Sequence, residues 1–321
     1  MKLKIFFVAD PVETLKPASD SSLALLRVAQ DRGHRTYWLT DKDVEYVNGK
    51  VMLRVRKCGA FCSEGFPSLG EVEVLDAESF HAGLIRKDPP FNDDYVRLCW
   101  ILALIEKKVL FVNRPSLLVR YHEKLLPLEA FSQGFLKKTD LIPTHLGTGL
   151  SATAFVQNLK MPLVVTKPFL GYGGKNIDQW KKEDFINQGM SHPEKWEGFV
   201  VQPFLKEVLQ EDRRLLVIDG KIRGQFVRVP PPGGFVANLA QGGTAEYRPL
   251  SKAQQSVGER AARFLKKIGM VFSGLDLIGS KVSEINVTSP TGFMSYQKLK
   301  GENLATHVIS SIERNARRCK R

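Results

Sequence analysis

Short apolar segments alternate with amphipathic segments in the first third of the chain, and this pattern restricts the fold more than any other feature. Buried strands are expected at residues 2–9, 35–39, 84–86 and 109–112. One helix is expected to begin at Asp20-Ser21-Ser22 and to end at Gly33. A second helix is expected over residues 95–106, and Pro115 begins a third. Asn48-Gly49 predicts a hairpin turn. The alternation of strands and helices predicts an α/β domain with a mostly parallel sheet.

From about Tyr121 onward the pattern changes to strands that are joined by short turns. Strands are expected at residues 163–167, 198–202, 214–218, 221–227, 271–278 and 281–287, with one amphipathic helix at residues 255–268. Three prolines and two glycines between Val229 and Gly234 exclude regular structure and predict an exposed, mobile loop. Because no repeat or low-complexity linker separates the two regions, we expect closely packed domains with a site between them.

Composition excludes several protein classes and leaves one question about charge. The chain has 321 residues, of which 43% are hydrophobic and 25% charged, so a disordered, collagen-like or coiled-coil protein is excluded. About two domains are expected at this length. The formal net charge is +13, which is compatible with an anionic partner. Glu313 to Arg321 contains five basic residues and one acid, and we expect this end to be solvated.

The sequence predicts a cytoplasmic protein without a membrane partner. The apolar N-terminal segment is interrupted at Asp10-Pro11, too early for a signal peptide. The next longest apolar run, residues 98–105, is far shorter than the ~20 residues that span a bilayer. Cys58, Cys62, Cys99 and Cys319 form no CxxC pair, so free thiols in a reducing compartment are expected.

A glycine-rich segment follows the strand that ends at Thr166-Lys167. Gly171-Tyr172-Gly173-Gly174-Lys175 could bring backbone N–H groups and a lysine close to phosphate oxygens. The segment is neither a Walker A loop nor a GxGxxG motif. An ordinary hairpin turn therefore stays open as an alternative.

Acidic residues interrupt two apolar strands near the end of the chain. Glu284 and Asn286 lie two positions apart and so on one face of their strand, and Asp276 lies on the preceding strand, which could pair with it. Carboxylate and amide oxygens are suitable ligands for Mg²⁺ that carries substrate phosphates. Structural salt bridges to arginine are the alternative.

A third polar cluster flanks the proline-glycine loop. It contains Glu211-Asp212-Arg213-Arg214, Arg228 and Asn238. Cations beside a mobile loop suit the recognition of phosphate and carboxylate groups. Exposed charges at strand ends would give the same pattern.

Between Asp10 and Gly292 the order and spacing of these motifs resemble the bacterial type of glutathione synthetase. The matching strings are RKDPPF (86–91), VNRP (112–115), EKL (123–125), TKP (166–168), DG (219–220), NLA (238–240), GLD (274–276) and EINVTSPT (284–291). The resemblance implies a Rossmann-like (pre-ATP-grasp) α/β domain at residues 1–121, followed by an α+β ATP-grasp domain at residues 122–321. The first lobe of that domain, 122–200, would carry the glycine loop, and the second, 201–321, the lid loop and the metal site.

The resemblance also implies a role for individual positions. ATP as co-substrate would be bound by Lys124, Lys167, Gly173, Gly174, Gln202, Pro203, Phe204, Leu205 and Asp212. The ligands of Mg²⁺ or Mn²⁺ would be Asp276, Glu284 and Asn286. Arg214 and Arg228 would be catalytic. The remaining substrates would be bound by Asp20, Ser21, Arg86, Asn238, Ser289 and Thr291.

The activity that the resemblance implies is the ADP-forming ligation of γ-glutamylcysteine to glycine through an acyl phosphate, in a homo-oligomer that would be a tetramer. The chain departs from the family pattern at Leu170, Tyr172, Asn176-Ile177-Asp178, Val236-Ala237, Thr244 and Phe293-Met294-Ser295. A related carboxylate–amine ligase with another acceptor therefore stays an alternative. A non-catalytic nucleotide- or polyanion-binding protein is another, although no nucleic-acid-binding module is recognisable and no nucleic-acid partner is expected.

Overall fold

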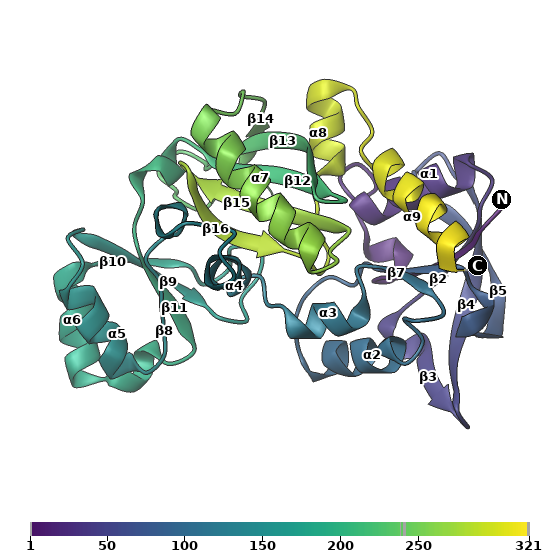
Figure 1. Cartoon of the computed structure of the whole chain (residues 1–321), viewed down its shortest axis with the longest axis horizontal. Helices are drawn as coiled ribbons and strands as arrows, with labels where there is room; N and C mark the ends of the chain where they lie inside the picture. The colour runs from purple at the N-terminus through teal and green to yellow at the C-terminus, as the bar shows by residue number, and fades with distance from the viewer. Residues whose placement is uncertain (1, 238, 240–241, 320–321) are drawn as a thin grey trace.

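Three sheets organise the chain in a computed structural model that describes residues 2–237, 239 and 242–319 (Figure 1). The first sheet belongs to the N-terminal domain, and the other two form the lobes that follow it. Short 3-10 helices connect several elements, namely η1 (Val12–Thr14), η2 (Asp41–Asp43), η3 (Ala77–Ser79), η4 (Lys138–Asp140), η5 (Pro193–Trp196) and η6 (Lys206–Leu209).

The N-terminal sheet has seven strands in the order β3-β4-β2-β1-β6-β7, with β5 paired to β4. Its strands are β1 (Lys4–Val8), β2 (Arg35–Leu39), β3 (Val44–Val47), β4 (Lys50–Phe61), β5 (Pro67–Asp76), β6 (Ala82–Ile85) and β7 (Leu110–Val112). β1 pairs in parallel with β2 and β6, and β6 pairs in parallel with β7. β4 is antiparallel to β2, β3 and β5.

The prediction of a mostly parallel sheet is therefore wrong for half of these pairings. The cause is the long hairpin of β4 and β5. Most residues of β5 are exposed, so its sequence lacks the apolar pattern by which a strand is recognised. The turn predicted at Asn48-Gly49 is confirmed, because it joins β3 to β4 and both residues have positive φ, 49° and 85°.

Three predicted helices of this domain are confirmed. They are α1 (Ser21–Asp31), α2 (Asp93–Ala103) and α3 (Pro115–Arg120). Asp20 precedes α1, and its carboxylate accepts a hydrogen bond from the backbone N of Leu23 at 2.8 Å. Asn92 caps α2 in the same way through Tyr95 N.

The first lobe is a small unit with its own core. Its sheet has the order β10-β9-β11-β8, built from β8 (His145–Leu146), β9 (Leu163–Pro168), β10 (Asp178–Lys181) and β11 (Phe199–Pro203). The helices α5 (Gly149–Gln157) and α6 (Lys182–Ser191) cover it, and α4 (Leu126–Ser132) precedes it. Phe185 and Trp196 stack at 4.3 Å between ring centroids in its core.

The second lobe is an antiparallel sheet of order β14-β13-β12-β15-β16. Its strands are β12 (Asp212–Ile218), β13 (Lys221–Val229), β14 (Thr244–Glu246), β15 (Phe272–Ile278) and β16 (Lys281–Asn286). The helices α7 (Lys252–Lys267), α8 (Phe293–Lys300) and α9 (Ala305–Cys319) follow in this part of the chain. The turn predicted at Asp219-Gly220 is confirmed, and both residues have positive φ.

The N-terminal domain and the second lobe share their hydrophobic core, as the lack of a linker predicts. One cluster of buried side chains joins Phe6 and Leu98 to Leu215 and Leu275. In Figure 1 the C-terminal helix α9 lies beside α1, at the opposite end of the molecule from the first lobe. Glu313 of α9 pairs there with Arg32 at 2.8 Å, so the first residue of the basic C-terminal segment is docked against the N-terminal domain.

Two further expectations can be compared with the fold. Cys58, Cys62 and Cys99 are free thiols, as predicted. Among the described residues, no helix has both the length and the apolar character that crossing a membrane requires.

Candidate active site

A cavity of about 360 Å³ lies between the N-terminal domain and the two lobes. Its walls include Asp88 and Pro89 from the N-terminal domain, Lys167 from β9 of the first lobe, and Asp276 and Glu284 from adjacent strands of the second lobe. β15 pairs with β16, as the sequence allows, and the register places Asp276 directly opposite Glu284. The site thus depends on all three parts of the fold.

One end of the cavity is apolar. Val165, Phe204 and Val208 form a small buried cluster there, against which Ile278 and Phe235 pack. Phe235 follows the proline-glycine loop and meets Phe204 edge to face, with ring centroids 5.9 Å apart. Apolar walls of this kind suit a flat aromatic ring such as a nucleobase.

The lysines Lys124 and Lys167 line the cavity. The ammonium of Lys124 donates to the Glu123 carboxylate and to the Gly171 carbonyl, both at 2.7 Å. The ammonium of Lys167 donates to Ser283 Oγ at 3.3 Å. Lys167 therefore connects the first lobe to the second, and Lys124 connects the glycine-rich loop to the segment before α4.

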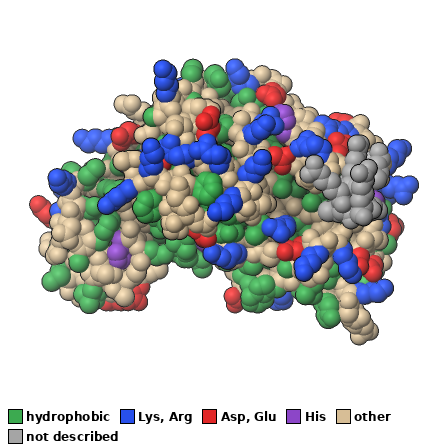
Figure 2. All heavy atoms as spheres, viewed as in Figure 1, with side chains coloured by type: hydrophobic (Ala, Val, Ile, Leu, Met, Phe, Trp, Pro, Cys, Tyr) green, Lys and Arg blue, Asp and Glu red, His purple; other side chains and the backbone are tan. Residues whose placement is uncertain are grey.

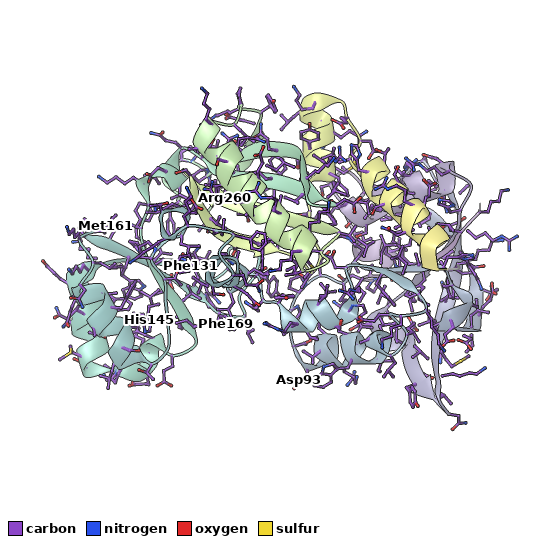
Figure 3. The ribbon with its side chains drawn as sticks, viewed as in Figure 1. Asp93, Phe131, His145, Met161, Phe169 and Arg260 are labelled. Carbon is purple, nitrogen blue, oxygen red and sulfur yellow. The ribbon has the colours of Figure 1, made fainter. Side chains whose placement is uncertain are left out.

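The glycine-rich loop lies along this wall. Gly173 and Gly174 have φ values of 66° and 76°, a backbone region that L side chains rarely adopt. Phe169, at the start of the loop, stacks on His122 with 4.2 Å between ring centroids. Figure 3 shows Phe169 on the side of the first lobe that faces the N-terminal domain.

A buried network of charges forms the floor of the cavity. The guanidinium of Arg214 donates to both oxygens of Asp276, at 2.5 and 2.9 Å. Arg228 lies 3.0 Å from Asp276 and donates to Asp212 at 2.7 Å. Asn286 donates from Nδ2 to Asp276 at 3.1 Å. Two arginines therefore share two carboxylates.

The pKa directions follow from this arrangement. Burial alone would raise the pKa of Asp276, but Arg214 and Arg228 hold it below its usual range. Burial would lower the pKa of Arg228, and the carboxylates of Asp212 and Asp276 raise it instead. Burial raises the pKa of Asp212 although Arg228 opposes the shift. Arg228 thus stays a cation, and Asp276 stays an anion.

Glu284 and Asn286 are the oxygen donors best placed for a divalent ion. Within the described part of the chain, no hydrogen bond or ion pair holds the Glu284 carboxylate, and Asn286 uses its amide nitrogen toward Asp276. Both oxygens of Asp276, by contrast, are taken by arginine. No set of three or more His, Cys, Asp and Glu residues suited to a metal occurs among the described residues. A site with few protein ligands is typical of Mg²⁺, because this ion completes its coordination shell with phosphate oxygens and water.

The N-terminal side of the site is built around Arg86. This buried guanidinium donates to Ser22 Oγ at 3.2 Å and to the Pro290 carbonyl at 3.0 Å. Ser289 Oγ donates back to the Arg86 carbonyl at 3.3 Å. Arg86 therefore fixes the segment after β16 against the N-terminal domain.

Comparison with known proteins identifies the family. The model of the prokaryotic glutathione synthetase N-terminal domain matches residues 3–119, and the model of the ATP-grasp domain of the same family matches residues 136–301. The chain belongs to the prokaryotic glutathione synthetase family. A glutathione synthetase of Mesorhizobium japonicum is 32% identical over 324 residues, covering 98% of this chain and 99% of that protein. A glutathione synthetase of Coxiella burnetii is 33% identical over 323 residues, covering 98% and 97%.

Solved structures agree on the fold. A D-cycloserine synthetase has a TM-score of 0.64 at 16% identity and covers 98% of this chain and 99% of that one. The D-alanine–D-alanine ligase of Coxiella burnetii has a TM-score of 0.61 at 11% identity and covers 99% and 96%. This chain therefore has the ATP-grasp fold after an α/β N-terminal domain, as the resemblance implies.

Most of the residues that the family resemblance marks out line the cavity. They are Lys124, Lys167, Gly173, Gly174, Gln202, Pro203, Phe204, Leu205, Asp212, Arg214, Arg228, Asp276, Glu284, Asn286, Ser289 and Thr291. Asp20, Ser21 and Arg86 are not among its lining residues: Asp20 caps α1, Ser21 is buried, and Arg86 donates to the carbonyl of the lining residue Pro290. Asn238 lies outside the described residues.

Several lining residues were assigned no role in the sequence analysis. Glu123, Ser283 and Phe235 are the most informative of them, since the first two hold the lysines and the third closes the apolar end. Glu123 directly precedes Lys124, so the adjacent pair of charges was the available signal. For Phe235, the only signal in the sequence was an aromatic residue directly after a loop of prolines and glycines.

Proposed function

We propose that this chain is an ATP-dependent ligase that joins the carboxylate of γ-glutamylcysteine to the amine of glycine and releases ADP and phosphate. Family membership supports this activity, and one feature of the cavity carries it. Lys124, Lys167, Arg214 and Arg228 bring positive charge to a single cavity that has an apolar end. Such a cavity suits a nucleoside triphosphate together with a second anionic substrate.

In this reaction the protein has to position the substrates and to stabilise their negative charge. The substrate carboxylate attacks the γ-phosphorus, the bond to the ADP oxygen breaks, and an acyl phosphate forms. The amine nitrogen then attacks the acyl carbon, the bond from carbon to the phosphate oxygen breaks, and one amine proton leaves with the phosphate. Lys124 and Lys167 would bind phosphoryl oxygens, while Arg214 and Arg228 would balance the charge of phosphate or carboxylate groups. No side chain has to act as a nucleophile.

The donor set fits a divalent ion, for which we propose Mg²⁺ or Mn²⁺. Glu284 and Asn286 would hold the ion, with Asp276 beside them. When bound, the ion supplies positive charge to the phosphate oxygens. Asp276 additionally keeps both arginine side chains in place.

The proposal is tested with purified protein, ATP, Mg²⁺, γ-glutamylcysteine and glycine. Glutathione and phosphate should form in a ratio of one to one, and omission of γ-glutamylcysteine or of glycine should stop the formation of both products. Turnover of ATP only with other carboxylates or amines would favour the alternative of a related ligase. A cytoplasmic location and a tetramer stay predictions of the family resemblance.

Glu284→Gln tests the metal assignment. The amide keeps the shape of the side chain but removes the free carboxylate, so metal-dependent turnover should fall by at least about 100-fold while the melting temperature changes little. Glu259→Gln on α7, outside the lining residues, is the control and should keep full activity. Wild-type turnover in Glu284→Gln would contradict the assignment.

A further inference from the structure

A second cavity, of about 30 Å³, adjoins the first on the side of the glycine-rich loop. The two cavities share Pro89, Glu123, Gly171, Tyr172 and Thr288 among their lining residues. The small cavity, which we call the side pocket, is therefore continuous with the place where Lys124 meets Gly171. A group bound in the side pocket would therefore lie close to Lys124, which we propose to bind phosphoryl oxygens.

Aromatic side chains from three segments build the side pocket. Phe91 and Tyr95 pack at 5.4 Å between centroids, and the ring of His122 meets Phe91 edge to face at 6.0 Å. Leu170 and Tyr172 of the glycine-rich loop close the other side, although they are 53% and 36% exposed. Large apolar side chains exposed on a loop beside a cavity mark a place where an apolar group can bind.

The charged side chains that line the side pocket are already paired. The two ionic side chains of the side pocket already have partners, because Lys87 pairs with Asp10 at 2.6 Å and Glu123 pairs with Lys124 at 2.7 Å. The hydroxyl of Tyr95 is buried, has no nitrogen or oxygen partner among the described residues and lies against the Cys99 thiol. The side pocket thus offers mainly apolar walls to an occupant.

The size of the side pocket limits what it can hold. A water molecule needs about 10–15 Å³ of such space, so about 30 Å³ accommodates a group of one to three heavy atoms. Glycine has no side chain and would leave this space unfilled. The side chain of alanine or of 2-aminobutyrate fits it, whereas that of phenylalanine does not.

We propose that the side pocket binds the side chain of the acceptor amino acid, so that this chain ligates amino acids with small apolar side chains as well as glycine. The inference rests on the proposed function, since it places the acceptor in the same reaction. The bond changes are those given for glycine: the amine nitrogen bonds to the acyl carbon, phosphate leaves, and one amine proton leaves with it.

The first experiment compares acceptors with the full-length purified protein, ATP, Mg²⁺ and γ-glutamylcysteine. Tripeptide formation is measured by mass spectrometry, and kcat/KM is determined for glycine, L-alanine, L-2-aminobutyrate and L-phenylalanine. L-alanine and L-2-aminobutyrate should react with kcat/KM within about 10-fold of glycine, and L-phenylalanine should give no product. Discrimination against L-alanine beyond roughly 200-fold, the upper end for a single methylene, would overturn the inference. Comparable use of L-phenylalanine would overturn it as well.

The second experiment changes the wall of the side pocket. Leu170→Ser and Tyr172→Ser should each lower the ratio of kcat/KM for L-alanine to that for glycine by roughly 10-fold. Leu150→Ser is the matched control, because Leu150 is 62% exposed on α5 and lines neither cavity. An unchanged ratio in both pocket variants would overturn the inference. If glycine is the only acceptor that gives a product, the inference about the side pocket is wrong but the proposed function stands. If no acceptor gives a product, the proposed function is wrong too.

Discussion

Asp276 shows how single residues make a buried charge tolerable in this fold. The carboxylate is fully buried between β12 and β16, and such a charge is costly unless it is paired. Arg214 and Arg228 supply that pairing, and Asn286 adds a hydrogen bond. Buried ion pairs contribute little net stability compared with apolar residues of similar size. Their presence in the floor of the cavity is therefore better explained by binding of anionic substrates than by folding.

His122 gives a prediction about pH. Burial, with a further contribution from Lys124, lowers the pKa of His122 to about 4, so the folded state favours the neutral ring. The stability that this group contributes is fully present above the unfolded value of about 6.5 and is lost as the pH falls through 4. In His122→Phe, the free energy of unfolding should decline less between pH 7 and pH 4 than in the wild type. Denaturant unfolding at several pH values measures this, and parallel curves for the two proteins would contradict it.

Residues of the site can be predicted from the sequence wherever a local pattern is sufficient to place them. Alternation along the last two strands placed Glu284 and Asn286 on one face and Asp276 on a neighbouring strand, and the register confirms both. The pairing of Asp276 with arginines from β12 and β13 was left open, because it depends on which strands are neighbours in the sheet. Ser283 became visible only in the fold, because the lysine it holds comes from the other lobe.

Among the elements, the glycine-rich loop and the hairpin of β4 and β5 show opposite limits of sequence analysis. Glycines identified the loop, since positive φ at Gly173 and Gly174 is a local requirement. β5 has no such signal, because it pairs at the edge of the sheet with β4 and most of its side chains face solvent. The helices α5 and α6 were also absent from the prediction. In α5, apolar residues follow no clear helical period, and its sequence alone therefore does not identify it.

Gly149 tests how closely α5 packs within the first lobe. A Cβ atom at this position would lie 1.5 Å from the carbonyl oxygen of Pro193, so alanine cannot be accommodated without moving the backbone. Gly149→Ala should therefore reduce the free energy of unfolding by about 2–3 kcal/mol, although alanine favours helices. Leu150→Ala, at the exposed neighbouring position, should change it by less than about 0.5 kcal/mol. Equal effects in denaturant unfolding would refute this close packing.

For the whole molecule, the decisive feature is that the N-terminal domain and the second lobe are not independent. Asn113, just after β7, makes four hydrogen bonds to the backbone of the second lobe. Its Nδ2 donates to the carbonyls of Phe272 and Val287, and its Oδ1 accepts from the N–H groups of Val271 and Phe272. One buried side chain thus fixes the start of β15 and the residue after β16 against the N-terminal domain, and β16 is the strand that carries Glu284 and Asn286.

Asn113→Ala should therefore destabilise both parts together. It leaves buried backbone groups without partners, and each such group costs about 1–3 kcal/mol, so a loss of at least about 3 kcal/mol is expected. Asn158→Ala removes a single exposed hydrogen bond and should cost about 0.5 kcal/mol or less. Calorimetry measures both, and a similar small effect in the two variants would show that the interface does not depend on Asn113.

The net charge of +13 also has an explanation at this scale, although only a partial one. Figure 2 shows Lys and Arg side chains spread over the visible face with acidic side chains between them, rather than in one block. Other cations are used inside the fold, as when Arg260 of α7, labelled in Figure 3, pairs with Asp140 at 2.7 Å. Five line the cavity, at Lys124, Lys167, Lys175, Arg214 and Arg228. The proposed anionic substrates would account for these five, and nothing in the structure explains the surplus.

In the proposed reaction this cavity activates a carboxylate by transferring the γ-phosphoryl group of ATP to it. The most direct test supplies γ-glutamylcysteine that carries ¹⁸O in both oxygens of its cysteinyl carboxylate, together with ATP and glycine, and follows the label by mass spectrometry. One ¹⁸O atom should appear in each phosphate released, because the bond from the acyl carbon to the labelled oxygen breaks when the amine attacks. Phosphate without the label, formed with oxygen from water, would contradict the account.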